Sequence, residues 1–221
     1  MIVAVDTPQG PGRFLVDRAA EQAALLVLGH GAGGSTAAAD LQLLAQRLPP
    51  LGVTVARFEQ PWRTAGRRVA GPPATLDEAW TAAVGWLAEQ AGEPGRLFLG
   101  GRSAGARVAC RTAAGLGAVG VVCLAFPLHL PGRPEKSRAQ ELLSAGVPRL
   151  VLQGTKDSFG TADEIRAAIG STAGIRLVEL PGADHGYRLA KANPFTPADL
   201  RTTVVAEVSA LILGISPDDP C

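Results

Sequence analysis

The chain has 221 residues, of which 47% are hydrophobic and 19% are charged, and its formal net charge is +1. This length suffices for one well-packed core, so we expect a single domain over residues 1–221. The small net charge gives no electrostatic reason to expect a nucleic-acid or anionic-membrane partner. No apolar run approaches the ~18–20 residues of a membrane span, and the first residues lack the basic start of a signal peptide. Together with only three cysteines, these features favour a cytoplasmic protein.

Apolar runs and amphipathic segments alternate along the chain and predict strands followed by helices. The predicted strands are 2–5, 12–16, 23–28, 52–58, 97–99, 118–126, 148–153 and 176–180. The predicted helices are 36–48, 75–90, a segment after Ser103, 139–145, 161–169 and 197–213. Thr75, with Glu78 three residues later, is expected to cap the second helix. The first two strands flank a Pro- and Gly-rich turn and predict a hairpin, while the later continuous apolar runs are typical of buried parallel strands.

This alternation predicts an α/β fold with a mostly parallel, doubly wound sheet flanked by helices. Only about twenty residues separate the strand ending at Phe126 from the one beginning near Arg149. They leave room for no separate cap domain. In such sheets ligands bind at the carboxyl ends of the strands, so residues that follow strands are the candidates for a site.

Ser103 lies in Gly101-Arg102-Ser103-Ala104-Gly105, directly after an apolar strand and before a helix. This is the G-x-S-x-G nucleophile elbow, in which a strained turn exposes the serine hydroxyl. A chain with 27 glycines can also produce the pattern by chance. Asp157 and His185, which follow later strands, favour the interpretation of Ser103 as a nucleophile.

Asp157 and His185 follow two later strands and complete the order Ser103, Asp157, His185, which is the order of an α/β-hydrolase triad. A serine hydroxyl needs an imidazole to accept its proton, and the imidazole needs a carboxylate to hold its tautomer. Asp157 also has the alternative role of a helix N-cap. Asp163 and Asp184 are the rival acids.

The backbone N–H groups of Ala104 and of Ala32, with Gly31 as the alternative to Ala32, are the predicted oxyanion donors. Gly31 is also predicted to let a substrate approach the backbone. His30 is expected to order this loop through hydrogen bonds rather than to transfer protons. The three histidines stand without other ligands at metal-binding spacing, so we expect neither a metal nor another cofactor.

The polar loop 59–73 carries Trp62, Arg63, Arg67 and Arg68, and Arg102 adds a charge beside Ser103. One interpretation is a solvated basic loop with a packed tryptophan. The other is that one or two of the arginines receive a substrate carboxylate or phosphate, for which a guanidinium is well shaped, which makes Trp62, Arg63 and Arg102 candidate substrate-binding residues. His129, in a Pro-rich loop after a strand, is predicted either to line the same pocket or to be exposed. We expect that pocket to be shallow and open, formed by loops 59–73 and 127–134.

The sequence resembles the small α/β-hydrolases of the KANL3/Tex30-like group, which is similar to dienelactone hydrolases. The resemblance is carried by His30–Gly34, Gly101–Gly105, Phe126-Pro127-Leu128 followed by Pro131-Gly132, Gly154–Asp157 and Ala183–Gly186. It covers nearly the whole chain and implies an α/β-hydrolase fold without a cap and a triad of Ser103, Asp157 and His185. Dienelactone hydrolases proper have cysteine at the elbow, which counts against that narrower assignment.

The sequence therefore predicts a serine hydrolase that cleaves a small ester or thioester through an acyl-enzyme. One alternative is a binding or scaffold protein that keeps the fold without turnover. Another is an acyltransferase or perhydrolase that uses the same triad. The natural substrate, the acyl chain length and the oligomeric state stay open at this point.

Overall fold

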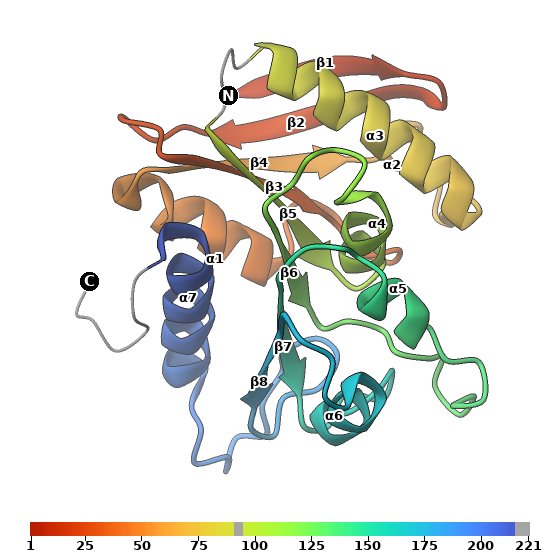
Figure 1. Ribbon diagram of the computed structural model, residues 1–221, viewed down its shortest axis with the longest axis vertical. Helices are drawn as coiled ribbons and strands as arrows, with labels where there is room; N and C mark the ends of the chain where they lie inside the picture. The colour runs from red at the N-terminus through yellow and green to blue at the C-terminus, as the bar shows by residue number, and fades with distance from the viewer. Residues whose placement is uncertain (91–94, 215–221) are drawn as a thin grey trace.

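The computed structural model describes residues 1–90 and 95–214 and contains an eight-stranded sheet between two layers of helices (Figure 1). The strand order is β1-β2-β4-β3-β5-β6-β7-β8. The strands are β1 (Ile2–Thr7), β2 (Gly10–Asp17), β3 (Ala24–Gly29), β4 (Val53–Glu59), β5 (Arg96–Arg102), β6 (Gly120–Leu124), β7 (Arg149–Gly154) and β8 (Ile175–Leu180). Neighbours from β4 to β8 are parallel. The mostly parallel, doubly wound sheet predicted from the sequence is therefore present.

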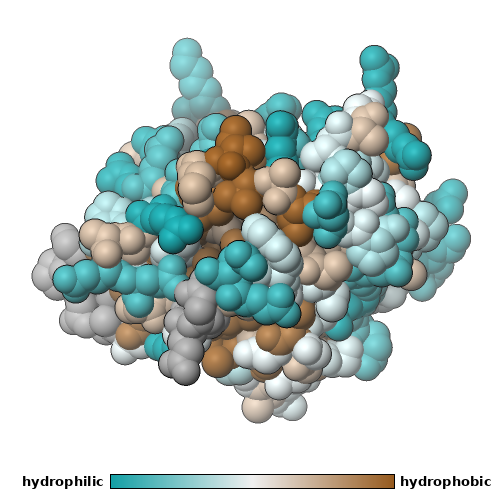
Figure 2. Space-filling view, turned by 90° about the horizontal axis from the view of Figure 1, so that it is seen from above, coloured by the Kyte–Doolittle hydropathy of each residue, from teal (hydrophilic) through white to brown (hydrophobic). Residues whose placement is uncertain are grey.

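Strands β1 and β2 form the predicted hairpin at one edge of the sheet, and β2 continues antiparallel against β4. The turn is closed by Thr7, whose hydroxyl donates to the carbonyl of Gly10 over 2.7 Å. Gly10 has a φ of 104°, which a glycine adopts without steric cost. Figure 2 views the molecule from this end and shows a patch of hydrophobic side chains among hydrophilic ones. Met1 and Ile2 at this edge are exposed.

Seven α-helices lie in the described ranges 1–90 and 95–214, on the two faces of the sheet (Figure 1). They are α1 (Ala39–Arg47), α2 (Pro61–Thr64), α3 (Pro73–Gln90), α4 (Ala104–Thr112), α5 (Ala139–Leu143), α6 (Ala162–Ile169) and α7 (Pro197–Leu213). Helices α1 and α7 cover one face, where Leu41 and Val204 belong to the same buried cluster. Helices α3 to α6 cover the other face, with Trp80 and Ile165 in its cluster. None of the helices described is both long and apolar enough to cross a membrane.

Two helices begin elsewhere than predicted. Helix α1 begins at Ala39 rather than near Thr36, because the preceding residues form a turn in which the N–H of Ala38 donates to the carbonyl of Ser35 over 3.1 Å, and the carbonyl of Thr36 accepts a hydrogen bond from the Arg57 guanidinium over 2.9 Å. Helix α3 begins at Pro73, so Thr75 lies inside its first turn. The Thr75 hydroxyl donates to the carbonyl of Pro72, and the predicted capping role of Thr75 is wrong.

The loops over the carboxyl edge also differ in detail from the prediction. Loop 59–73 contains the short helix α2, with proline at its first position. Strand β6 stops at Leu124 because Ala125 has a φ of 49°, outside the strand region. Residues 125–148 hold only α5 and a loop closed by a bridge between Leu130 and Arg133. As predicted, this connection contains no cap domain.

Candidate active site

Ser103 sits in the sharp turn between β5 and α4. Its φ of 52° and ψ of −110° are strained for a residue with a side chain. The turn is tight because Gly105 lies against the backbone of Gly29 in β3, so closely that a Cβ on Gly105 would overlap it. Glycine is therefore required at this position of the elbow. The strained turn lifts the Ser103 side chain from the strand end toward the loops above it.

The three residues predicted to be catalytic meet at the carboxyl edge of the sheet. His185 Nε2 lies 3.0 Å from Ser103 Oγ, and His185 Nδ1 lies 2.8 Å and 2.9 Å from the two carboxylate oxygens of Asp157. Asp157 is fully buried, whereas the side chain of His185 is 21% exposed. A buried carboxylate therefore holds one ring nitrogen of His185 and leaves the other to face the serine.

Asp157 is held by two further donors that the sequence did not single out. Gln153 Nε2 donates to Asp157 Oδ2 over 3.0 Å, and the N–H of Phe159 donates to Oδ1 over 2.8 Å. The ring of Phe159 stacks on the ring of His185, with centroids 4.1 Å apart. These contacts orient both the carboxylate and the imidazole. The D-x-F spacing after β7 is the local signal for Phe159, and it is too common in proteins to indicate this role.

Arg102 is engaged within the protein on both terminal nitrogens. Nη1 pairs with Asp40 Oδ2 at 2.5 Å, and Nη2 donates to the backbone carbonyl of His185. Burial opposes the charged form of Arg102, but Asp40 outweighs it and raises the pKa of the guanidinium. The arrangement links α1 to the backbone of His185. No sequence signal pointed to Asp40.

Tyr187 packs beneath Arg102, whose guanidinium carbon lies 5.2 Å from the centre of its ring. Its hydroxyl donates to the carbonyl of Leu152 over 2.7 Å and accepts from the N–H of Ala125 over 2.9 Å. Burial raises the pKa of the Tyr187 phenol well above its ordinary value. The neutral phenol thus ties the segment after His185 to the ends of β6 and β7.

The predicted oxyanion donors lie on two segments next to Ser103. Ala104 is the first residue of α4, so its N–H has no acceptor within the helix. A Cβ placed on Gly31 would lie 3.5 Å from the Cβ of Ser103, which puts the glycine-rich loop of Gly31 and Ala32 against the elbow. Ala32 is exposed and Gly31 is buried. The two segments thus approach each other as an oxyanion site requires.

His30 orders this loop through hydrogen bonds. Its Nδ1 donates to the carbonyl of Gly31 over 2.9 Å, and its Nε2 accepts from the N–H of Gln60 over 3.2 Å. Burial lowers the pKa of His30 below its ordinary value of 6.5, which favours this neutral form. Trp62 packs edge-on against the His30 ring at 5.5 Å and is itself buried.

The remaining residues predicted to bind substrate occupy different surroundings. Arg63, on α2 beside Trp62, is half-buried, whereas Arg67 and Arg68 are exposed. His129 is buried, and its Nε2 lies 3.2 Å from the Glu164 carboxylate while its Nδ1 contacts the carbonyl of Leu130. His129 therefore ties its loop to α6.

Asp184 and Asp163, the alternative candidates for the triad carboxylate, make other contacts. Asp184 Oδ1 accepts the N–H groups of Gly186 and Arg188 within its own turn. Asp163 pairs with Arg166 on the surface of α6. Helix α6 is capped by Thr161 rather than by Asp157. Over residues 1–90 and 95–214, no group of three or more His, Cys, Asp or Glu side chains is arranged to hold a metal ion.

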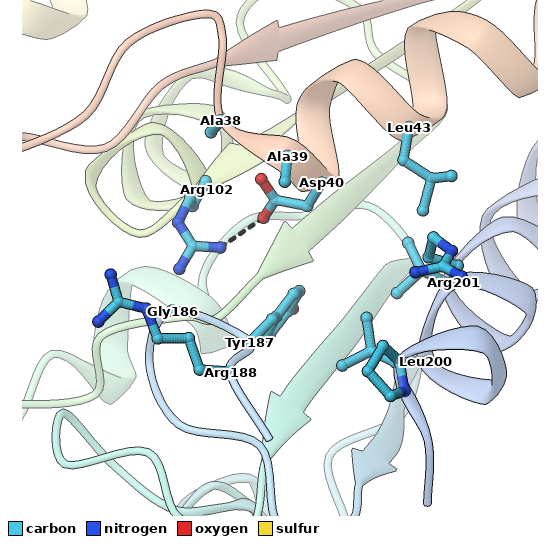
Figure 3. Close-up of a pocket in the computed structure, with 12 residues that line it drawn as sticks. Ala38, Ala39, Asp40, Leu43, Arg102, Gly186, Tyr187, Arg188, Leu200 and Arg201 are labelled. Atoms are coloured by element: carbon cyan, nitrogen blue, oxygen red, sulfur yellow. Dashed lines mark hydrogen bonds and ion pairs between the residues drawn. The ribbon is translucent and has the colours of Figure 1, made fainter. Parts of the chain in front are cut away.

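A pocket of about 380 Å³ lies beside the triad, between α1 and α7 (Figure 3). It is lined by Arg102 and by Gly186, Tyr187 and Arg188, together with residues of the two helices. The substrate pocket predicted between loops 59–73 and 127–134 is a different place: Gln60, Trp62 and Ala70 of loop 59–73 line a small cavity beside the elbow together with His30, Ala32 and Ala104. The pocket between α1 and α7 was not predicted, because it depends on helices that are distant in sequence from the elbow.

Several solved structures share this fold. A protein from Coxiella burnetii, described as an alpha-beta serine hydrolase homologue, is 18% identical and has a TM-score of 0.75, covering 93% of this chain and 95% of its own. A protein from Xanthomonas campestris, described as an α/β serine hydrolase without lid, is 24% identical with a TM-score of 0.72, covering 100% and 96%. Est1E from Butyrivibrio proteoclasticus is 15% identical with a TM-score of 0.75, covering 97% and 99%.

These likenesses confirm the predicted α/β-hydrolase fold. The alpha/beta hydrolase domain family matches residues 22–213, which is most of the chain and includes the elbow, Asp157 and His185. The protein therefore belongs to the alpha/beta hydrolase domain family.

Proposed function

We propose that this protein is a serine hydrolase that cleaves a small ester or thioester through an acyl-enzyme intermediate. The observation that carries the proposal is the continuous hydrogen-bond chain from Ser103 Oγ through His185 to Asp157. Such a chain activates a hydroxyl that is otherwise a weak nucleophile at neutral pH. It uses Ser103 as nucleophile, His185 as base and Asp157 as the group that orients His185.

In the first half of the reaction, Ser103 Oγ attacks the substrate carbonyl carbon while His185 Nε2 accepts the hydroxyl proton. The carbonyl oxygen becomes an oxyanion held by the N–H groups of Ala104 and Ala32. His185 then donates its proton to the leaving alcohol or thiol as the bond to the carbonyl carbon breaks. The acyl group stays on Ser103.

In the second half, a water molecule attacks the acyl-enzyme and gives its proton to His185. The tetrahedral intermediate collapses, the proton returns to Ser103 Oγ, and the carboxylic acid leaves. Gly31 lies against the elbow, and Trp62 and Arg63 lie on α2, where Trp62 packs against His30. We assign these three residues to the part of the site that contacts the substrate. Because Arg102 is occupied by Asp40 and by the His185 carbonyl, we assign it to positioning His185.

Descriptions of two structural neighbours support this choice of chemistry. Esterase 2 of Thermogutta terrifontis, 16% identical with a TM-score of 0.70, is described as phosphorylated by paraoxon. Est1E is described with ferulic acid bound. An esterase that paraoxon phosphorylates and a protein that holds a small carboxylic acid are consistent with our proposal. We also retain as proposals the narrower KANL3/Tex30-like assignment and a cytoplasmic location.

The test is labelling with a fluorophosphonate probe, followed by turnover of p-nitrophenyl acetate and butyrate and of short acyl thioesters. Wild-type protein should be labelled and should hydrolyse at least one of these substrates, whereas Ser103→Ala should do neither. Labelling that persists in Ser103→Ala would place the nucleophile elsewhere. A wild-type protein that neither labels nor turns over any substrate would favour a binding or scaffold protein, and acyl transfer to added alcohols or peroxide in preference to water would favour the transferase alternative.

A further inference from the structure

The pocket between α1 and α7 has an apolar floor. Leu43 comes from α1 and Leu200 from α7 (Figure 3). Val204, also in the lining, comes from α7. Leu43 is half-buried and Leu200 is 7% exposed, and both belong to the apolar cluster in which Val204 is fully buried. The volume of about 380 Å³ lies in the range of pockets that hold small organic ligands. A short alkyl chain suits this lining.

The rim of the pocket is positively charged. Arg188 and Arg201 both line it and both are exposed. Over residues 1–90 and 95–214, neither guanidinium has a hydrogen bond or an ion pair. The acid in the lining, Asp40, is already neutralised by Arg102 (Figure 3). The rim therefore carries two unpaired guanidinium groups, on opposite sides of the pocket in Figure 3, without a compensating carboxylate, and they favour an anionic ligand.

The pocket is separate from the position of the reacting ester. Its lining, among the residues described, includes neither Ser103 nor His185. Arg102 stands between the two places, because its guanidinium lines the pocket while it donates to the His185 carbonyl. A ligand in the pocket thus contacts Arg102, which binds the His185 carbonyl, rather than Ser103.

We propose that this pocket is a binding site for an amphipathic carboxylate, a medium-chain fatty acid anion in its chemistry. The alkyl chain lies on the floor of Leu43, Leu200 and Val204, and the carboxylate lies at the rim that Arg188 and Arg201 make positive. The proposal goes beyond the ester hydrolysis above and does not depend on it. The charge and the apolar lining together select the ligand class. A neutral alkane would form no ion pair with the arginines, and a small anion would make no contact with the apolar floor.

The test is calorimetric titration of decanoate, octanoate and hexanoate into Ser103→Ala protein, so that turnover plays no part. We expect affinity to fall about fourfold for each methylene removed, because each buried methylene contributes about 0.8 kcal/mol. The Arg188→Gln/Arg201→Gln double variant should bind decanoate at least tenfold more weakly. Decyltrimethylammonium, with the same chain and the opposite charge, should bind at least tenfold more weakly than decanoate.

Ala39→Trp provides a steric test, because Ala39 is an exposed residue of α1 that lines the pocket. The indole should fill the cavity and abolish decanoate binding without changing the melting temperature by more than a few degrees. Arg47→Gln, at the other end of α1 and outside the lining, is the matched control and should bind like the parent. Absence of decanoate binding at millimolar concentration would overturn the proposal, and so would binding that survives both Ala39→Trp and the double arginine variant. Neither outcome bears on ester hydrolysis, which the probe labelling tests.

Discussion

Two aspartates, Asp157 and Asp184, lie near His185, and their different hydrogen-bond partners give them different roles. Asp157 is buried and contacts His185 Nδ1 with both oxygens. Asp184 adjoins His185 in sequence, yet its carboxylate is turned back onto the N–H groups of its own turn. Neighbours in a tight turn rarely face each other with hydrogen-bonding geometry, so the distant aspartate holds the ring and the adjacent one shapes the turn.

We expect Asp157→Asn to lower kcat for a p-nitrophenyl ester by about 10³- to 10⁴-fold, because an amide N–H toward Nδ1 favours the wrong imidazole tautomer. The matched control is Asp184→Asn, in which the amide oxygen still accepts the turn N–H groups, and its kcat should stay within about threefold of wild type. Steady-state kinetics at pH 7.5, with a thermal melt of each variant, make the measurement. The reverse order of effects would assign the acid to Asp184.

Asp40 acts on the same histidine through Arg102. We expect Asp40→Asn to lower kcat by about tenfold with little change in KM, because the weakened ion pair frees Arg102 and loosens its hold on the His185 carbonyl. Asp40→Glu should recover part of the loss. A rise in KM with unchanged kcat would show instead that Arg102 binds substrate.

At the scale of elements, the elbow depends on how closely α4 packs against β3. Gly105 in α4 lies against the backbone of Gly29, with a Cβ position only 2.9 Å from the Gly29 Cα. Real Cβ atoms do not approach backbone so closely, so the two elements meet at this distance only because neither has a side chain there. The close contact also sets where α4 begins and so where Ser103 and the Ala104 N–H lie.

We expect Gly105→Ala to cost about 3 kcal/mol or more in the free energy of unfolding, since the added methyl must push α4 away from β3. Urea denaturation followed by circular dichroism measures the change. Gly85→Ala is the matched control: Gly85 lies in α3 with open space around its Cβ position, and the substitution should stabilise by about 0.5–1 kcal/mol. Equal stability of the two variants would contradict the close-packing explanation.

At the scale of the whole molecule, ion pairs join the helices on one face of the sheet. Arg107 and Arg111 of α4 both contact Glu141 of α5, at 2.6 Å and 2.9 Å, and Arg111 also contacts Asp77 of α3 at 2.6 Å. Burial disfavours the charged form of Glu141, but the two arginines outweigh it and hold its pKa below the ordinary value. The folded protein therefore binds fewer protons at this group than the unfolded chain does in mildly acidic solution.

Because the pKa of Glu141 is lowered on folding, its stabilising contribution is complete above the unfolded pKa of about 4.3 and is lost as the pH falls through the folded value. Glu141→Gln should therefore lower the melting temperature at pH 7 and differ little from wild type near pH 3. Glu135→Gln, which changes an exposed glutamate of the neighbouring loop, should match wild type at both pH values. A Glu141→Gln deficit that persists unchanged at pH 3 would mean that the ion pairs do not cause it.

The sequence by itself determined the order of the strands and helices along the chain, the elbow, and the three candidate catalytic residues. These features follow from local chemistry: apolar runs predict buried strands, and glycines around Ser103 predict a tight turn. The acid and the histidine could be found because each directly follows a strand. The start of α3 was missed because a proline at the first helical position competes with a threonine cap two residues later, and local patterns do not decide between them.

Only the tertiary structure decided which distant residues support the site. Asp40 reaches Arg102 and Tyr187 reaches β6 and β7 because the chain places β3 beside β5 and brings α1 and α7 together over one face of the sheet. The pocket between α1 and α7 likewise exists only because these two helices pack side by side. Such contacts depend on which elements become neighbours in the folded sheet, and that choice is made by the packing of the whole core rather than by the residues on either side of each position.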